Sequence, residues 1–224
     1  MMKESYFTPQ TIAGKAQQFC REYAAGRNRR LERFDAQRSV LLVLDMQAYF
    51  LQPESHAYIP SAPVILPGLR QLVDAYAAGR LPVIFTRHLN TPQNAACMAS
   101  WWSDILTEEN HLSMLAPELE PAAGDVLFKT QYDAFHGTRL EVLLHSMRVE
   151  QLVICGVMTH LCCETTARSA FVRGFEVFFT LDGTATYTEA HHRATLLNLS
   201  HGFAALALVS EVVVACREET NANT

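Results

Sequence analysis

Six short apolar segments recur along the chain, and a helical or loop segment separates each from the next. They lie at residues 39–45, 81–88, 124–130, 150–157, 175–182 and 204–210. They lack a clean alternation of apolar and polar residues, which is typical of strands in a parallel sheet covered on both faces. Helical periodicity is found over residues 66–79, 138–147, 162–174 and 189–202. The alternation predicts an α/β fold: an open, mostly parallel six-stranded sheet with helices on both faces, in three layers.

The length of the chain is that of one sizeable domain. It has 224 residues, of which 49% are hydrophobic, so it can bury a substantial core. We expect a helical extension over residues 1–38, the α/β domain over 39–215 and a polar, frayed tail over 216–224. Five arginines lie within residues 21–33. They indicate either an arm for an anionic partner or, as we favour, a helix packed on its own domain or on a second subunit.

Charge and cysteine content limit the classes of partner. The net charge of −5 gives no general attraction to nucleic acid or to an anionic membrane. No apolar run is long enough to span a bilayer, and no secretory signal is recognisable. Six cysteines in such a chain are expected to be free thiols in a reducing cytoplasm. We therefore predict a cytoplasmic protein that binds neither nucleic acid nor membrane.

Two common cofactor motifs are missing from the sequence. No G-x-G-x-x-G follows the first predicted strand, and no G-x-x-x-x-G-K-[ST] is found anywhere. The sequence therefore gives no support to a dinucleotide or nucleoside triphosphate, and we expect no cofactor.

Reactive side chains stand where three of the predicted strands end. Asp45 ends the first strand, Lys129 ends the third, and Cys162 follows the fourth at the start of a helix. Ligands of open parallel sheets bind outside the carboxyl ends of the strands. Lys129 is conspicuous because the chain has 15 arginines and only two other lysines, Lys3 and Lys15.

Cys162 is the candidate nucleophile. In the first turn of a helix, the dipole and nearby N–H groups stabilise a thiolate, so we expect a depressed pKa. Asp45 would accept the thiol proton and later return it to the leaving group. Alone, the three residues also have structural interpretations as a helix cap, a solvated cation and a packed thiol. Their convergence favours catalysis, with Cys163 packed inward and His160 supporting the site.

Three separated motifs carry a resemblance to a known family. They are "VLLVLDMQAYF", "VLFKTQYDAFHGTRLE" and "ICGVMTHLCCETTARSAFVRGFEVFFTLDGTAT". In this order and spacing they resemble the isochorismatase-like cysteine hydrolase superfamily over roughly residues 39–210.

The resemblance implies a mechanism and an assembly. By position, the catalytic triad would be Asp45, Lys129 and Cys162, and the cysteine would form an acyl-enzyme with a small-molecule substrate. The resemblance also implies a cis peptide between Val157 and Met158, with the N–H groups of Met158 and Cys162 as the oxyanion hole. A homodimer or homotetramer is expected.

Metal binding differs within the superfamily. Its nicotinamidases bind a metal through an Asp-x-His motif and a later histidine. Here that motif is missing, and His56 and His88 stand alone. We therefore predict no metal, and the sequence argues against nicotinamide as the substrate.

The type of reaction is open between two branches of the superfamily. Isochorismatases cleave a vinyl ether and carry glycine at the position of Cys162, because that reaction needs no thiol. The cysteine favours cleavage of a C–N bond in a small amide, ureido or carbamoyl compound. The alternatives are a vinyl-ether hydrolase with Asp45 as proton donor, and a non-catalytic binding protein.

Side chains near the triad are candidates for substrate contacts. Gln47 would orient Asp45, Arg87 and His88 at the end of the second strand would bind a carboxylate, and Thr159 would shape the turn before the nucleophile. The predicted substrate-binding residues are Gln47, Arg87, Trp101, Tyr132, Phe135 and Thr159. Trp101, with Trp102, would roof the pocket or anchor a surface loop or a subunit contact, and Phe135 could equally belong to the core.

Overall fold

The structure is a computed structural model. It describes residues 2–23, 30–102, 104–119 and 125–222.

The centre of the fold is a parallel sheet, as the apolar segments predict. Within the described residues, its six strands are β1 (Ser39–Leu44), β2 (Val83–His88), β3 (Asp125–Lys129), β4 (Gln151–Val157), β5 (Glu176–Ala185) and β6 (Ala205–Ala207). Their order is β3-β2-β1-β4-β5-β6, and every neighbouring pair is parallel. Each residue of β1 and β4 is buried, which explains why these two segments read as continuous apolar runs.

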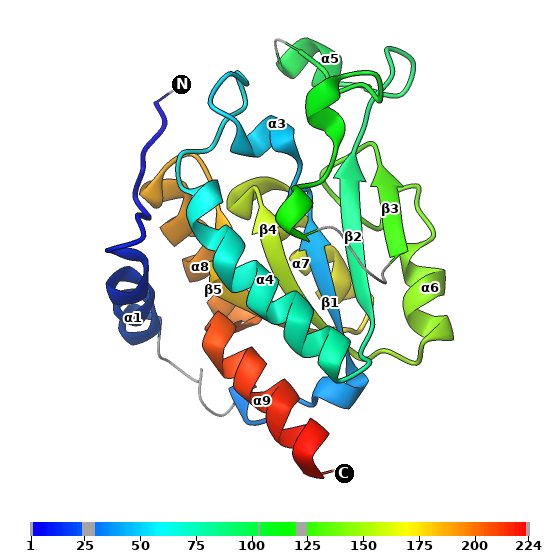
Figure 1. The fold of residues 1–224 in the computed structure, drawn as a ribbon. Coiled ribbons are helices and arrows are strands. Elements are labelled where there is room, and N and C mark those ends of the chain that lie inside the picture. Colours follow the sequence, from blue (N-terminus) through cyan, green and yellow to red (C-terminus); the bar gives the residue numbers. More distant parts are fainter. Residues whose placement is uncertain (1, 24–29, 103, 120–124, 223–224) are drawn as a thin grey trace.

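Helices cover both faces of the sheet (Figure 1). The longer helices are α1 (Ile12–Glu22), α4 (Ala62–Ala78), α6 (Leu140–Ser146), α7 (Glu164–Val172), α8 (Glu189–Gly202) and α9 (Val209–Ala222). Short turns of helix are α3 (Ala48–Leu51), α5 (Met98–Trp101), η1 (Ala36–Arg38), η2 (His111–Ser113), η3 (Pro117–Leu119) and the π-helical turn η4 (Thr159–Cys163). Helices α4 and α9 lie side by side in front of the sheet, and α7 lies behind it.

The C-terminal segment differs from the prediction. Strand β6 ends at Ala207, and α9 begins at Val209, so residues 208–210 are not part of a strand. Helix α9 continues through Ala222, and the expected boundary between residues 215 and 216 falls inside it. The short run "VSEVVVAC" is compatible with either a strand or a buried helix, and packing against α4 decides for the helix.

Two arginines of the predicted helical extension, which precede β1, pack on the α/β domain. The side chain of Arg33 forms an ion pair with Glu176, and Arg30 donates to the carbonyl oxygen of Ser200. These arginines therefore contact the chain's own domain, whereas Arg27 and Arg29 lie outside the described residues.

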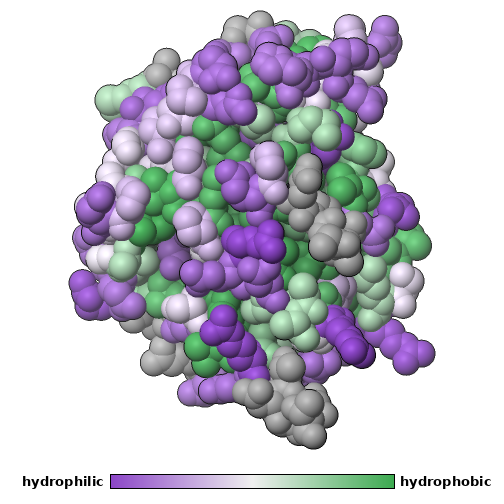
Figure 2. Space-filling model, in the orientation of Figure 1, coloured by the Kyte–Doolittle hydropathy of each residue, from purple (hydrophilic) through white to green (hydrophobic). Residues whose placement is uncertain are grey.

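The molecular surface is mixed in character. Hydrophilic and hydrophobic residues are interspersed over the face drawn in Figure 2. Within the ranges that the structure describes, no helix combines the length and the apolar character needed to cross a membrane.

The strand order reverses between β1 and β4, and this reversal opens a crevice at their carboxyl ends. From β1 the chain moves outward to β2 and β3, and from β4 it moves to β5 and β6. Crossover connections leave the two central strands in opposite directions, so no helix covers the sheet edge between them. Asp45 follows β1 directly, and the turn bearing Cys162 follows β4.

Gly156 allows β1 and β4 to meet closely beside this crevice. Its φ angle is +112°, and a Cβ atom there would lie 2.1 Å from the carbonyl oxygen of Leu44. No side chain fits at this distance, and the obstructing atom belongs to rigid backbone. Glycine is therefore required two residues before Met158.

We predict that Gly156→Ala lowers the free energy of unfolding by at least about 3 kcal/mol, because steric overlap adds to backbone strain. Gly174→Ala is the control, since its φ is +90° but nothing lies within 4 Å of the added Cβ. That control carries the dihedral cost alone, about 1–2 kcal/mol. Urea unfolding followed by circular dichroism measures both, and equal losses would contradict the steric argument.

Candidate active site

Asp45 lies at the floor of the crevice. It has a φ of +51°, a left-handed conformation that aspartate tolerates better than most residues, and its side chain is fully buried. Thr86 donates its hydroxyl to Oδ1 at 2.6 Å and accepts the N–H of Asp45 at 3.1 Å. These paired hydrogen bonds fix the carboxylate relative to β2.

Lys129 brings the other polar groups together. Its Nζ lies 2.8 Å from Oδ2 of Asp45, 3.0 Å from the carbonyl oxygen of Gln131, 3.3 Å from Nδ1 of His88 and 3.4 Å from Sγ of Cys162. The ammonium is buried and therefore depends on these partners in place of water. The structure thus brings together the three residues predicted as a triad and adds His88.

The buried charges of Asp45 and Lys129 stabilise one another. Burial would raise the pKa of Asp45, but Lys129, His88 and the Thr86 hydrogen bond together hold this pKa below its usual value. Burial would lower the pKa of Lys129, but Asp45 and Cys162 hold it above the usual value. Both groups are therefore charged near neutral pH.

Cys162 corrects two expectations from sequence. It lies in the π-helical turn Thr159–Cys163, whereas α7 begins at Glu164. Burial and the Asp45 carboxylate raise the pKa of the Cys162 thiol to about 12, and Lys129 only partly opposes them. The resting thiol is therefore protonated, so the expected depressed pKa is wrong, and a base must remove the proton during reaction.

An apolar and aromatic cavity opens above Cys162. Its lining residues come from segments that follow five of the strands: Tyr49, Phe50, His56, Ala57, His88, Asn90, Met98, Trp102, Asp104, Ile105, Leu106, Tyr132, Met158, Leu161, Cys162 and Tyr187. The indole Nε1 of Trp102 donates to the hydroxyl of Tyr132 at 2.8 Å and joins two sides of the cavity. None of these described lining residues is lysine or arginine.

The peptide bond between Val157 and Met158 is cis, as the resemblance predicts. Met158 and Cys162 both line the cavity, and the turn Thr159–Cys163 lies between them.

Comparison with known proteins identifies the family. The Isochorismatase domain model matches residues 39–211, more than three quarters of the sequence. The chain belongs to the isochorismatase family.

Individual relatives within the isochorismatase family carry different names. Nicotinamidase 3 of Arabidopsis thaliana is 38% identical over 173 residues, covering 75% of this chain and 83% of that protein. Enterobactin synthase component B of Escherichia coli K12 is 29% identical over 185 residues, covering 81% of this chain and 65% of that protein. The crystal structure of a cysteine hydrolase from Pseudomonas syringae pv. phaseolicola shares the fold, with a TM-score of 0.76 and 24% identity over 83% of this chain and 95% of that one.

The groups around Lys129 also bear on metal binding. Among the described residues, one cluster has the spacing of a metal site: a carboxylate oxygen of Asp45, a ring nitrogen of His88 and Sγ of Cys162 lie within 4.8 Å of one another. The ammonium of Lys129 contacts all three. The positive charge of Lys129 thus already occupies the position that a metal ion would take among these three groups. The donor set therefore does not fit an additional metal ion.

Trp101 is not at the cavity, contrary to prediction. Its side chain is 78% exposed, whereas the adjacent Trp102 lines the cavity beside Tyr132. Both tryptophans lie at the end of α5, where successive side chains point about 100° apart, so only one can face inward. Tyr132 lies where the sequence predicts it.

Arg87 and Phe135 are also placed away from the cavity. The guanidinium of Arg87 donates to the carbonyl oxygen and hydroxyl of Ser113 and packs over the ring of Phe128. Phe135 stacks in the core against Phe175. Neither side chain is therefore available to a substrate.

Gln47 supports His88 instead of Asp45. Its fully buried amide donates to the carbonyl oxygens of Ser113 and His88 and accepts the N–H of His88. Thr159 is buried within the turn before the nucleophile and is not part of the cavity lining. Its location agrees with a role in shaping that turn.

His88, predicted with Arg87 to bind a carboxylate, instead contacts Lys129 and lines the cavity. Its Nε2 lies 2.8 Å from Oδ1 of Asn90, an acceptor, so the ring proton is on Nε2 and Nδ1 accepts from Lys129. Burial and Lys129 lower the pKa of His88 to about 4, so the ring is neutral near pH 7. Its position at the end of β2 is the sequence feature that could have identified it as a site residue. The same feature identifies Asp45 and Lys129.

We predict that Lys129→Met lowers the free energy of unfolding by about 3–5 kcal/mol, because the Asp45 carboxylate is left buried without its partner. The double variant Asp45→Asn, Lys129→Met should regain most of this loss. Arg70→Met is the control, because it breaks the exposed ion pair with Asp74 and should cost less than about 1 kcal/mol. Urea denaturation measures all three, and a Lys129→Met loss no larger than the control would refute the prediction.

We predict that iodoacetamide labels Cys162 more slowly than free cysteine at pH 7.5. Since the pKa of this thiol is raised, its thiolate fraction and labelling rate should keep rising to pH 9 and above. Mass spectrometry of the Cys162 peptide gives the rate, and free cysteine, with a pKa of about 8.5, is the reference. A rate that levels off below pH 7 would instead support a depressed pKa.

Proposed function

We propose that this protein hydrolyses the C–N bond of a small, uncharged amide, ureido or carbamoyl compound through a thioester on Cys162. One observation carries the proposal: at the floor of a cavity, the thiol lies 3.4 Å from a buried ammonium and within 4.8 Å of the buried carboxylate that pairs with it. A protonated thiol next to an ionised carboxylate is an arrangement for nucleophilic attack with general-base assistance.

The first half of the reaction forms the acyl-enzyme. As Sγ of Cys162 attacks the carbonyl carbon, Asp45 takes the thiol proton. The negative charge moves to the carbonyl oxygen, where the N–H groups of Met158 and Cys162 stabilise it. The C–N bond then breaks, and Asp45 returns the proton to the departing nitrogen, which leaves as ammonia or an amine.

The second half releases the acid. Asp45 takes a proton from water, the resulting hydroxide attacks the thioester, and the C–S bond breaks. The thiol regains its proton from Asp45, so water is consumed and the enzyme is restored. Lys129 keeps Asp45 ionised before each proton transfer and stabilises the cysteine thiolate when it forms.

The cavity favours a flat substrate without negative charge. Five aromatic side chains line it, namely Tyr49, Phe50, Trp102, Tyr132 and Tyr187, and none of the lining residues described is lysine or arginine. A dianion such as isochorismate would lack a positive partner there. The similarity to nicotinamidase 3 supports an aromatic amide, so nicotinamide belongs among the compounds to test despite the missing Asp-x-His motif.

A vinyl-ether hydrolase is the second candidate, because the matching family model is named for isochorismatase. This reaction needs Asp45 as a proton donor. The pKa of Asp45 is held below its usual value, so its carboxyl group is ionised near neutral pH and would have to take up a proton before it could donate one. The ionisation of Asp45 therefore favours the amidase.

A cytoplasmic location and a homodimeric or homotetrameric state stay predictions from the sequence.

The test is a panel of nicotinamide, benzamide, N-carbamoylsarcosine and isochorismate, assayed with the unaltered protein and with Cys162→Ala. We expect ammonia release from at least one amide or carbamoyl compound, reduced on the order of a thousandfold or more in Cys162→Ala. Cys163→Ala is the matched control, because that thiol is buried next to the site but does not line the cavity. Turnover of isochorismate that survives in Cys162→Ala would show the vinyl-ether reaction instead.

A further inference from the structure

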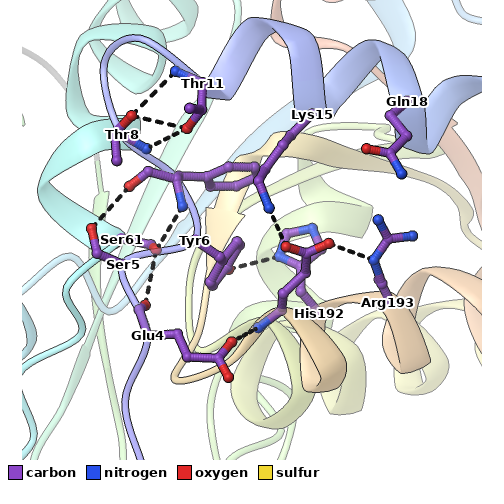
Figure 3. Close-up of polar contacts among 12 residues, drawn as sticks. Glu4, Ser5, Tyr6, Thr8, Thr11, Lys15, Gln18, Ser61, His192 and Arg193 are labelled. Carbon is purple, nitrogen blue, oxygen red and sulfur yellow. Dashed lines mark hydrogen bonds and ion pairs between the residues drawn. The ribbon is translucent and has the colours of Figure 1, made fainter.

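The N-terminal segment before α1, residues 2–11, lies against the loop between β5 and α8. The N–H of Glu4 donates to the carbonyl oxygen of Tyr187 at 2.7 Å, and the carboxylate of Glu4 accepts the N–H of Glu189 at 3.0 Å. The N–H of Phe7 donates to Oγ of Ser61 at 3.1 Å. Figure 3 shows Glu4 and Ser61 with their hydrogen bonds in this region. The segment is thus fixed along its length at both α4 and α8.

Tyr6 reaches inward from this segment. Its side chain is buried, its hydroxyl accepts the N–H of Thr186 at 3.0 Å, and the same oxygen lies 2.9 Å from Nδ1 of His192 (Figure 3). His192 is fully buried, and burial lowers its pKa to about 3. The pair is therefore a neutral hydrogen bond in the protein interior, where a lost partner is costly.

The hydrogen-bonded group continues to the turn that carries the nucleophile. Nδ1 of His192 lies 3.4 Å from Oγ1 of Thr159. Thr159 directly follows Met158 and opens the π-helical turn that contains Cys162. The polar contacts of Tyr6 therefore end between the two residues whose N–H groups stabilise the oxyanion in the proposed reaction.

The same segment also holds one wall of the cavity. Lys3 donates to the carbonyl oxygen of His56, and its ammonium lies 4.8 Å from the centre of the Tyr187 ring. His56 and Tyr187 both line the cavity. Two independent sets of contacts thus connect the first residues of the chain to the candidate active site.

We propose that the N-terminal segment is a working part of the active site and that Tyr6 is a positioning residue for the oxyanion-binding turn, acting through His192 and Thr159. The inference rests on the proposed function. It assigns a catalytic contribution to a segment that lies outside the matched family domain, residues 39–211. Loss of the hydroxyl should loosen the turn without changing how Asp45 and Lys129 contact the thiol.

Two reagents distinguish positioning of the turn from general stability. 4-Nitrophenyl acetate acylates a cysteine through a tetrahedral oxyanion: the C–S bond forms, the ester C–O bond breaks, and 4-nitrophenolate leaves. Iodoacetamide alkylates the same sulfur by displacing iodide at a saturated carbon, so no oxyanion forms. The ratio of the two rates therefore reports oxyanion stabilisation at Cys162.

The experiment compares Tyr6→Phe with Tyr23→Phe in the full-length protein. The hydroxyl of Tyr23 donates to the carbonyl oxygen of Arg193, so this control removes a contact to the same helix, next to His192. In Tyr6→Phe we expect acylation to fall about tenfold, less than the 10²–10³-fold of a lost oxyanion donor, with alkylation unchanged. In Tyr23→Phe both rates should be unchanged.

Thr159→Val tests the connection from its other end. It should cause the same selective loss of acylation, and the double variant with Tyr6→Phe should lose little more than either single variant, because both break one set of contacts. Fully additive losses would overturn the proposed connection.

Two results, with both rates measured on the Cys162 peptide, would overturn the role of Tyr6 alone, provided that amide or carbamoyl hydrolysis is lost in Cys162→Ala. One is an acylation rate that is unchanged in Tyr6→Phe. The other is an equal fall in the rates of acylation and alkylation, which would indicate a general loosening of the structure around Cys162. Amide or carbamoyl hydrolysis that survives in Cys162→Ala would overturn the proposed function and, with it, this role for Tyr6.

Discussion

The buried ion pair between Lys129 and Asp45 is the interaction on which the candidate site depends. Removing either charge from water is costly, and only close contact with the other, with further hydrogen bonds, offsets that cost. Thr86 supplies such a bond to Asp45, and the carbonyl oxygen of Gln131 and Nδ1 of His88 supply them to Lys129. The pair therefore requires β1, β2 and β3 to be in register. The pair also affects the thiol of Cys162, whose pKa is raised mainly by burial: Lys129 lowers this pKa, and the Asp45 carboxylate raises it.

The sheet explains how residues far apart in sequence reach one crevice. Parallel strands end at the same edge, and the reversal of order between β1 and β4 leaves that edge uncovered. This geometry is available to any chain of the same fold, so it does not by itself select a reaction. The reaction follows from what the strands end on: a carboxylate after β1, a neutral imidazole at the end of β2, an ammonium at the end of β3 and a thiol after β4.

The sequence predicts the strands and the residues at their ends, because a rule of sheet topology applies to them. It does not predict which way a single side chain points. Asp45, Lys129 and Cys162 follow from strand ends alone, and the six strands follow from apolar runs. Arg87 and His88 occupy neighbouring positions of one strand, so their side chains point to opposite faces, and composition does not tell which faces the cavity.

Electrostatic properties were harder still to predict. The helix dipole and Lys129 suggest a depressed pKa for Cys162, but burial and a nearby carboxylate outweigh them, and both depend on tertiary packing. The contact of Tyr6 with His192 has no local signal, because 186 positions separate the two residues.

That separation has a consequence for how the protein matures. Parallel strands form only non-local contacts, and here the segment of residues 2–11 also depends on Thr186 and His192, which are far from it in sequence. During synthesis the N-terminal residues leave the ribosome first and have no docking surface until β5 and α8 have emerged. Competence for chemistry would then arise only after the residues of α8 have been synthesised, so a translation product that stops before α8 would remain inert.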